Sequence, residues 1–108
     1  MPPLSDAEIE QGLAGIPGWA RDGDSIRKSF ELASFPDAIS FVTRVADLAE
    51  AADHHPDIDI RWRTVHLTLS THSEGGITQQ DLALAGQIEG VAPSGPPYPP
   101  PTTPQPGG

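Results

Sequence analysis

The sequence predicts an α+β fold in which three helices cover one face of a four-stranded antiparallel sheet. Two patterns predict these elements. In residues 35–52 apolar side chains recur at spacings of three and four, as on one face of an amphipathic helix. In residues 64–70 they alternate with polar side chains, as in a half-buried strand. The elements follow as helix, two strands, helix, two strands, helix, and this order favours helices packed on one face of an antiparallel sheet.

The first helix is predicted to begin after Ser5. Ser5 and Glu8 have the spacing of a capping box, in which each side chain accepts a hydrogen bond from a free N–H group at the helix start. The apolar residues that follow are Ile9, Leu13 and Ile16. The helix should end after two to three turns, near residues 15–17.

A hairpin is predicted after this helix. Residues 19–21 lead into a turn at Asp22-Gly23-Asp24, and the returning strand covers residues 26–32. Ile26, Phe30 and Leu32 share one parity, so they lie on one face of this strand.

The second helix is predicted to be the longest. Its start has a proline near the first helical position and Asp37 in the first turn. Its apolar stripe consists of Ala38, Ile39, Phe41, Val42, Val45, Ala46, Leu48, Ala49 and Ala52. The helix should end near Ala52. Because Pro56 forces His55 toward an extended backbone, the His-His-Pro segment lies at the junction between this helix and the next strand.

Two strands and a helix complete the predicted domain. A short strand is expected around residues 58–62. The next strand places Val65, Leu67 and Leu69 on one face and Thr64, His66, Thr68 and Ser70 on the other. After a loop at residues 72–76, Thr78 and Asp81 are predicted to cap a last helix. Its apolar residues are Leu82, Leu84, Ala85 and Ile88.

Residues 1–91 are predicted to form one domain, and residues 92–108 a disordered tail. The tail holds most of the chain's 13 prolines and no charged residue, so it cannot bury enough apolar surface to offset its ordering entropy. A polyproline II segment that docks in an aromatic groove is the alternative for Pro-Pro-Tyr-Pro-Pro-Pro. Because so small a domain buries only about 60 to 65% of its unfolded surface, we expect subunits to associate.

The composition excludes several classes of function. The net charge is −9 and the six basic residues are scattered, whereas nucleic-acid binding needs clustered Lys and Arg. No apolar run is long enough to span a membrane and the N-terminus lacks the features of a secretory signal, so we expect a cytoplasmic protein without a membrane partner. The absence of cysteine excludes disulfides and thiolate chemistry, which leaves His, Asp and Glu as the candidate reactive groups.

His54, His55 and His72 are the candidate catalytic residues. They follow a helix end and a strand end, positions that a fold can bring to one cleft. Imidazole has a pKa of about 6.5, so it gives and takes protons near neutral pH. Two or three such groups can drive an elimination without a cofactor, because one protonates the departing hydroxyl while another removes a proton from the neighbouring nitrogen.

Two other interpretations of the histidines remain open. His66 lies on the polar face of its strand and is interpreted as a structural or exposed residue. A metal site is the chemical alternative, because Asp53, Asp57 and Asp59 lie near the candidate histidines. The spacing disfavours it, since no His-x-x-x-His pair is present and adjacent histidines in extended backbone point to opposite sides.

A larger set of residues resembles a known family, the pterin-4a-carbinolamine dehydratases. The residues that carry this resemblance are Glu50, Asp53-His54-His55-Pro56, Trp62, the run Val65–His72 and Asp81. The resemblance extends back through Thr43–Ala46 and Gly18-Trp19, and forward through Ile88, so it covers nearly all of the predicted domain. The combined pattern is far more specific than any of its parts.

The resemblance implies a reaction and a set of site residues. The reaction is dehydration of the 4a-hydroxytetrahydropterin left by aromatic amino-acid hydroxylases, which gives quinonoid dihydropterin without any metal or organic cofactor. The implied assembly is a homodimer or homotetramer. His54 and His72 take the general acid/base positions, and His55 contacts the pterin. Further substrate contacts are implied for Glu50, Asp53, Pro56, Ser70, Thr71, Trp19 and Trp62.

Four of these residues also have simpler interpretations. Glu50 either orients a histidine or the substrate, or is a solvated carboxylate at a helix end. Asp81 is interpreted as a helix cap. Trp19 and Trp62 match aromatic positions of a pocket wall, but core packing is the preferred interpretation for both.

The alternative function is a non-catalytic interaction protein on the same scaffold. Relatives of the family include a dimerisation cofactor for a transcription factor and Rubisco assembly-associated proteins. Such relatives are expected to have lost part of the histidine set, whereas all three positions are filled here, which favours activity. Residues 57–61 and the proline-rich tail depart from the family pattern.

Overall fold

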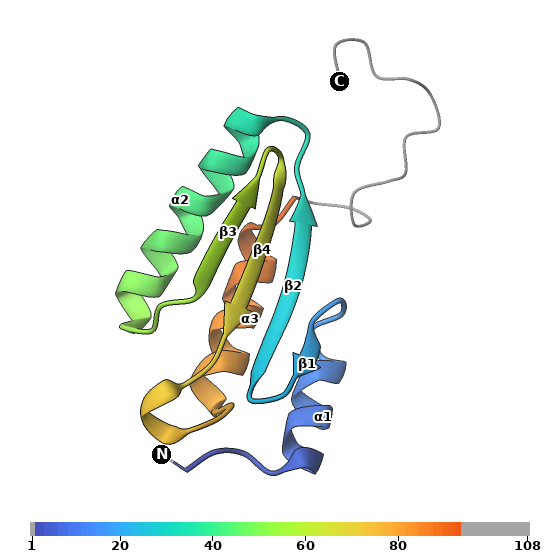
Figure 1. Cartoon of the computed structure of the whole chain (residues 1–108), viewed down its shortest axis with the longest axis vertical. Helices are drawn as coiled ribbons and strands as arrows, with labels where there is room; N and C mark the ends of the chain where they lie inside the picture. Colours follow the sequence, from blue (N-terminus) through green and yellow to red (C-terminus); the bar gives the residue numbers. More distant parts are fainter. Residues whose placement is uncertain (1, 94–108) are drawn as a thin grey trace.

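A computed structural model describes residues 2–93 of the chain, which form three helices and a four-stranded sheet (Figure 1). The helices are α1 (Asp6–Ala14), α2 (Phe35–Ala52) and α3 (Gln79–Val91). The strands are β1 (Ala20–Asp22), β2 (Ser25–Glu31), β3 (Asp57–Arg61) and β4 (Thr64–Leu69). A short 3-10 helix, η1 (His72–Glu74), precedes α3. The predicted order of elements is confirmed, and most of the predicted tail lies outside the described residues.

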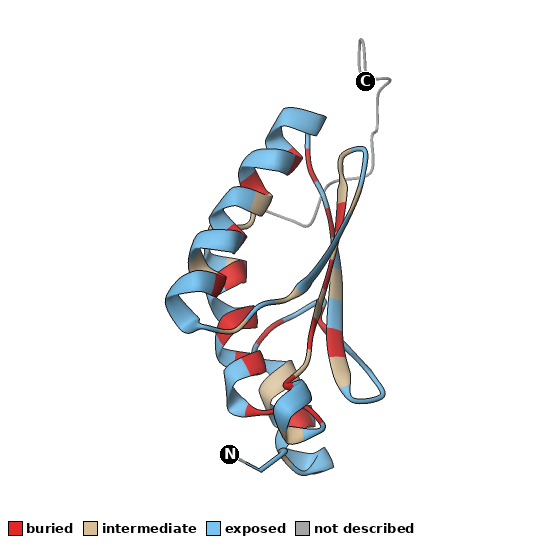
Figure 2. Ribbon diagram, turned by 60° about the vertical axis from the view of Figure 1, so that its left-hand side comes forward, coloured by how far each residue is buried: buried red, intermediate tan, exposed pale blue. Residues whose placement is uncertain are grey.

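The sheet is antiparallel throughout, with the strand order β1-β2-β4-β3. Ile26 of β2 lies opposite Leu69 of β4, and Phe30 lies opposite Val65. The apolar residues of the two central strands therefore share one face. The helices cover this face, and the buried residues line the two sides that meet (Figure 2).

All three predicted helix starts are confirmed. The side chains of Ser5, Ser34 and Thr78 each accept a hydrogen bond from a backbone N–H group in the first turn.

At α1, Glu8 accepts a hydrogen bond of 2.9 Å from the backbone N–H of Ser5. This bond, and then the serine hydroxyl, lowers the pKa of Glu8. The carboxylate therefore stabilises α1 above the ordinary glutamate pKa, and this contribution is lost as the pH falls through the lowered pKa.

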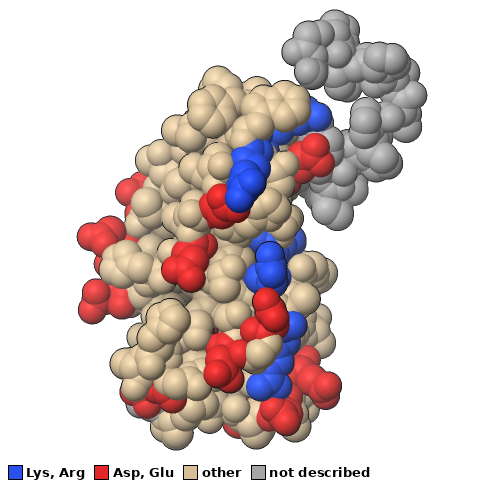
Figure 3. All heavy atoms as spheres, in the orientation of Figure 1, with Lys and Arg blue, Asp and Glu red and all other residues tan. Residues whose placement is uncertain are grey.

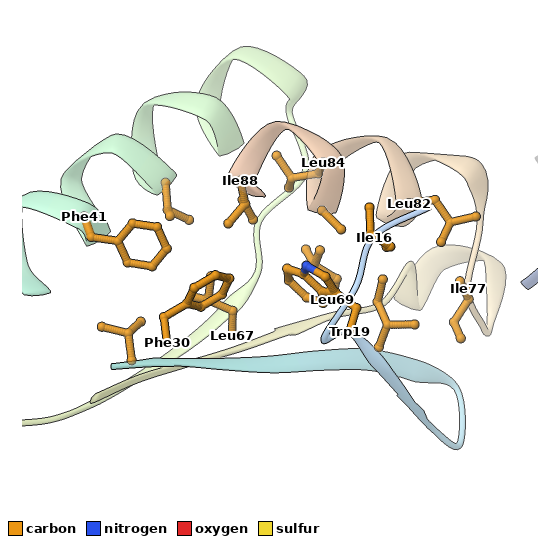
Figure 4. Close-up of a cluster of buried hydrophobic side chains, with 14 of the residues drawn as sticks. Ile16, Trp19, Phe30, Phe41, Leu67, Leu69, Ile77, Leu82, Leu84 and Ile88 are labelled. Atoms are coloured by element: carbon orange, nitrogen blue, oxygen red, sulfur yellow. The ribbon is translucent and has the colours of Figure 1, made fainter. Parts of the chain in front are cut away.

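The core lies between the helices and the sheet (Figure 4). Phe30 of β2 and Phe41 of α2 meet there with their ring centroids 4.9 Å apart. Trp19 packs edge-on against Phe30, at 6.2 Å between the ring centroids, and is only 5% exposed. The core interpretation of Trp19 is confirmed, and its indole N–H donates to Glu89 of α3 at 3.1 Å.

The core interpretation of Trp62 is wrong. Its side chain is 61% exposed, in the turn between β3 and β4, where its backbone has a φ of 56°. The guanidinium of Arg63 lies 4.7 Å from its ring centroid. Its neighbours Ile60 and Thr64 are only partly buried, so the turn extends beyond the core and the indole has no buried position to occupy.

The surface of the described residues carries charges of both signs. On the face shown in Figure 3, basic side chains are interspersed with acidic ones. Arg21, Arg27 and Arg61 each contact a carboxylate within 3.3 Å. The Lys and Arg on this face therefore do not gather into one basic patch. Within residues 2–93, none of the helices combines the length and the apolar character needed to cross a membrane.

Candidate active site

The predicted catalytic residues lie at one end of the molecule. The loop between α2 and β3 carries His54 and His55, and the segment between β4 and α3 carries His72 (Figure 1). The site is thus built from the end of the longest helix, the end of a central strand and the start of the last helix. The antiparallel pairing of β3 with β4 brings the first and second of these ends together.

His54 contacts a buried carboxylate. Its Nε2 lies 2.5 Å from Oδ1 of Asp81, and the two side chains are 10% and 0% exposed. Asp81 also accepts a hydrogen bond of 2.9 Å from the backbone N–H of Thr78, which makes it the predicted cap of α3. The cap interpretation is confirmed, and the contact with His54 is a second role that the sequence did not indicate.

Two threonines complete the surroundings of Asp81. Oγ1 of Thr71 lies 2.9 Å from Oδ2 of Asp81 and 2.8 Å from Oγ1 of Thr78. All three residues are buried. The hydroxyl of Thr71 is therefore engaged inside the protein, and a contact of Thr71 with a substrate stays a prediction. Because Thr71 directly precedes His72, the network connects the backbone at His72 to the side chain of His54.

His55 contacts a different acid. Its Nε2 lies 2.5 Å from Oε2 of Glu50, and both side chains are largely exposed, at 57% and 77%. This arrangement matches the prediction that Glu50 orients a histidine. Asp53 ends α2 in the left-handed conformation, with a φ of 51°, and this reversal directs the chain into the His-His-Pro segment. Pro56 is half-buried between that segment and β3.

His72 begins η1 and is exposed. It lines a hollow of about 330 Å³ together with Ser70 and Asp57. Ser70 donates a hydrogen bond of 2.8 Å to the backbone oxygen of Asp24, which fixes one wall of this hollow. His54 is not among the residues that line it. The hollow is therefore a candidate substrate surface on the His72 side of the site.

Three conspicuous residues lie away from this site. His66 is on the helix-free face of the sheet, where its Nδ1 lies 2.6 Å from Oγ of Ser29. Trp19 is in the core. Trp62 is at the far end of β4 from His72, and a strand of six residues spans about 20 Å. Neither tryptophan of the chain is brought next to the histidines.

Sequence reasoning named Asp57 only as a ligand of the metal alternative, and it did not place Thr78 in the site. Asp57 lies opposite Thr68 on the helix-free face, so the parity of β3 and β4 was the signal that could have placed it beside the end of β4. Thr78 was recognised only as a cap, because no spacing indicates its contact with Thr71. Within residues 2–93, no three His, Asp or Glu side chains converge as a metal-ligand set, so the metal alternative gains no support from their arrangement.

The sequence matches one family and its members. Residues 2–91 match the family model described as pterin 4 alpha carbinolamine dehydratase. A protein of Roseiflexus sp. (strain RS-1), provisionally named a pterin-4-alpha-carbinolamine dehydratase, is 62% identical over 88 residues, which are 82% of this chain and 95% of that protein. A protein of the same provisional name from Mycobacteroides abscessus is 59% identical over 86 residues, which are 80% and 92% of the two chains.

Two solved structures have the same fold. A transcriptional coactivator/pterin dehydratase from Brucella melitensis superposes with a TM-score of 0.81 at 32% identity, over 84% of this chain and 99% of that one. A pterin dehydratase-like protein described as a RuBisCO assembly factor in the alpha-carboxysome superposes with a TM-score of 0.61 at 25% identity, over 72% and 93%.

Proposed function

The chain belongs to the pterin 4 alpha carbinolamine dehydratase family, and we propose that it eliminates water from a 4a-hydroxytetrahydropterin to give the quinonoid dihydropterin. The observation that carries the proposal is the network that joins His54 to Asp81 and Asp81 to Thr71, the neighbour of His72. It supports an imidazole held in place at His54 and, through Thr71, a fixed backbone at His72. The proposed reaction uses these groups and no metal or organic cofactor.

The proposed reaction is an acid/base elimination. One imidazole protonates the hydroxyl at C4a of the pterin, and the C–O bond breaks as water leaves. A second imidazole removes the proton of the neighbouring ring nitrogen, and the electron pair of that N–H bond forms the new C=N double bond. Imidazole is the side chain suited to both halves, because its ordinary pKa of about 6.5 lets it give and take protons near neutral pH.

The surrounding residues are proposed to bind the pterin. His55, oriented by Glu50, offers an exposed ring at the same loop as His54. Ser70 offers a polar contact on the other side, in the hollow at His72. The backbone groups of Thr71 are already bonded to Glu74 and Gly76. Asp53 and Pro56 set the direction of the loop. Trp19 and Trp62 are not included in the proposed pocket of a single chain, since one is buried in the core and the other lies at the opposite end of β4.

The proposed physiological role is recycling of the pterin cofactor of an aromatic amino-acid hydroxylase. The second candidate function is a non-catalytic interaction protein on the same scaffold. It is favoured by the likeness of this fold to the pterin dehydratase-like protein described as a RuBisCO assembly factor. The filled histidine positions favour the enzyme.

A dehydration assay tests the proposed function. The purified chain is expected to accelerate the loss of water from chemically generated 4a-hydroxytetrahydropterin above the rate in buffer, as followed by the absorbance of the quinonoid product. The His66→Ala variant is expected to retain this activity, because His66 lies on the helix-free face and contacts Ser29. A rate no higher than that of buffer would contradict the enzymatic proposal and favour the interaction protein.

We also propose that the chain forms a homodimer or homotetramer. Among residues 2–93, four large apolar side chains are exposed: Phe35, Ile39, Ile58 and Trp62. Two lie on α2, and two lie on the edge strand β3 or in the turn after it, so association of copies at these elements would remove them from water.

Light scattering tests the oligomer and should give the mass of two or four chains. Ile58→Asp should lower this mass, whereas Gln87→Asp, on the exposed side of α3, should leave it unchanged. A monomeric mass at about 100 µM would contradict this proposal.

A further inference from the structure

We propose that Thr71, Thr78 and Asp81 are positioning residues that fix the proton of His54 on Nε2 and leave Nδ1 as the nitrogen that meets the substrate. The inference rests on the proposed function only for the reactive role of His54. The position of the proton is itself a property of the folded chain, so it can be measured without any reaction.

The direction of each hydrogen bond follows from Asp81. A carboxylate accepts hydrogen bonds and donates none. Oγ1 of Thr71, 2.9 Å from Oδ2 of Asp81, must therefore donate its single proton to the carboxylate. Since that proton is used, the 2.8 Å contact between Thr71 and Thr78 requires Thr78 to be the donor. The side-chain oxygen of Thr78 in turn accepts from the backbone N–H of Gln80 at 3.2 Å. The donor and the acceptor of each hydrogen bond from Gln80 to Asp81 are therefore defined.

The two carboxylate oxygens have different tasks. Oδ2 accepts from Thr71 and from the backbone N–H of Thr78, both at 2.9 Å. Oδ1 faces Nε2 of His54 at 2.5 Å. Because this oxygen is an acceptor too, Nε2 must carry the proton. A protonated Asp81 would reverse this bond, but Asp81 stands in the first turn of α3, where the free N–H groups and the helix dipole favour a negative charge.

The consequence is a defined role for His54. With its proton on Nε2, the neutral imidazole has its lone pair on Nδ1. No hydrogen bond joins Nδ1 to any of residues 2–93, so this nitrogen is left for the substrate. A histidine in this state is prepared to accept a proton, and the buried carboxylate stabilises the cation that forms. The geometry thus assigns His54 as the base for the ring N–H.

The native protein provides the direct test. In ¹⁵N-labelled protein near pH 7.5, long-range ¹H–¹⁵N correlation spectra distinguish the two neutral forms of histidine by the shifts of the ring nitrogens. His54 is expected to show the Nε2–H form, and its signals are assigned by their loss in His54→Gln. An Nδ1–H form, or equal amounts of both forms, would overturn the proposal.

Asp81→Asn provides the sharper variant. The two donors at Oδ2 hold the amide oxygen in that place, so the amide NH₂ group faces His54 and forces its proton to Nδ1. The expected result is the Nδ1–H form of His54 and a kcat lower by about 10- to 100-fold. The amide oxygen still accepts from Thr78, so α3 stays capped and the melting temperature should change little. In the Asp81→Asn background, Thr71→Val should populate both forms of His54, because one of the two donors that hold the amide oxygen is lost. Thr71→Ser in the same background keeps the hydroxyl and should retain the Nδ1–H form.

Asp37→Asn is the matched control. Asp37 is an exposed acid in the first turn of α2, after the capping residue Ser34, so the chemical change and the helical position are the same. It should leave the His54 signals and kcat unchanged. If Asp81→Asn also leaves both unchanged, Asp81 is only a cap and the proposal is wrong. If the native protein shows the Nε2–H form but no dehydration, the proposed function fails while this inference stands.

Discussion

Replacing His54 or His72 with alanine is expected to lower the turnover of 4a-hydroxytetrahydropterin by about 10² to 10⁴ in each variant. Each substitution removes one of the two proton-transfer groups of the proposed elimination, and water must then take its place. For His54 the loss also leaves the buried carboxylate of Asp81 without its imidazole partner. Steady-state kinetics on purified variants, with unfolding curves measured in parallel, would provide the comparison.

The fourth histidine is the control for these two variants. His66→Ala removes the same side chain from the helix-free face, where it contacts Ser29, so kcat should remain within about twofold of the native value. A loss of similar size in all three variants would mean that the substitutions act through folding. A full rate in either His54→Ala or His72→Ala would exclude that residue from the proton transfers.

The fold could be predicted because its signals are local. Ser5, Ser34 and Thr78 each begin a helix through bonds to residues within three positions, and sequence spacing alone indicates such bonds. The alternation in residues 64–70 fixed both faces of β4, which the observed burial confirms. The left-handed residue Asp53 was not predicted, because no glycine marks the end of α2. The exposure of Trp62 was not predicted either, since the length of the β3–β4 turn beyond the core is a property of the packed structure.

The candidate site could be predicted only in part, because some of its contacts join residues that are far apart in sequence. The three histidines and Glu50 are near one another in sequence or follow adjacent elements, so the sequence alone could predict that they lie at the same end of the molecule. The contact between His54 and Asp81 joins the loop after α2 to the first turn of α3. The spacing of Thr78 and Asp81 predicts only the cap, which uses Oδ2 of Asp81. It does not indicate that Oδ1 contacts His54. Thr71 was predicted as a substrate contact, and nothing in the parity of a strand end shows that its hydroxyl turns into the protein.

Phe41→Ala is expected to lower the free energy of unfolding by about 3 to 5 kcal/mol. Phe41 is 1% exposed, and its ring lies 4.9 Å from that of Phe30, so it joins α2 to the sheet across the middle of the core. Truncation would leave a cavity that neighbouring side chains on two rigid elements cannot fill. In a domain of this size the melting temperature should fall by more than about 10 °C. Thermal and urea unfolding followed by circular dichroism would measure both quantities.

Phe35→Ala is the matched control, because it makes the same change on the same helix at a side chain that is 48% exposed. Phe35→Ala should lower the free energy of unfolding by less than about 1 kcal/mol at low protein concentration.

The comparison of the two variants also bears on the site, since α2 carries the His-His-Pro loop at its end. If Phe41 anchors that helix, Phe41→Ala should retain its kcat at temperatures where it remains folded and lose activity only as it unfolds. A stable Phe41→Ala variant would mean that the contacts of α2 with α3, and not its contact with the sheet, hold the loop in place.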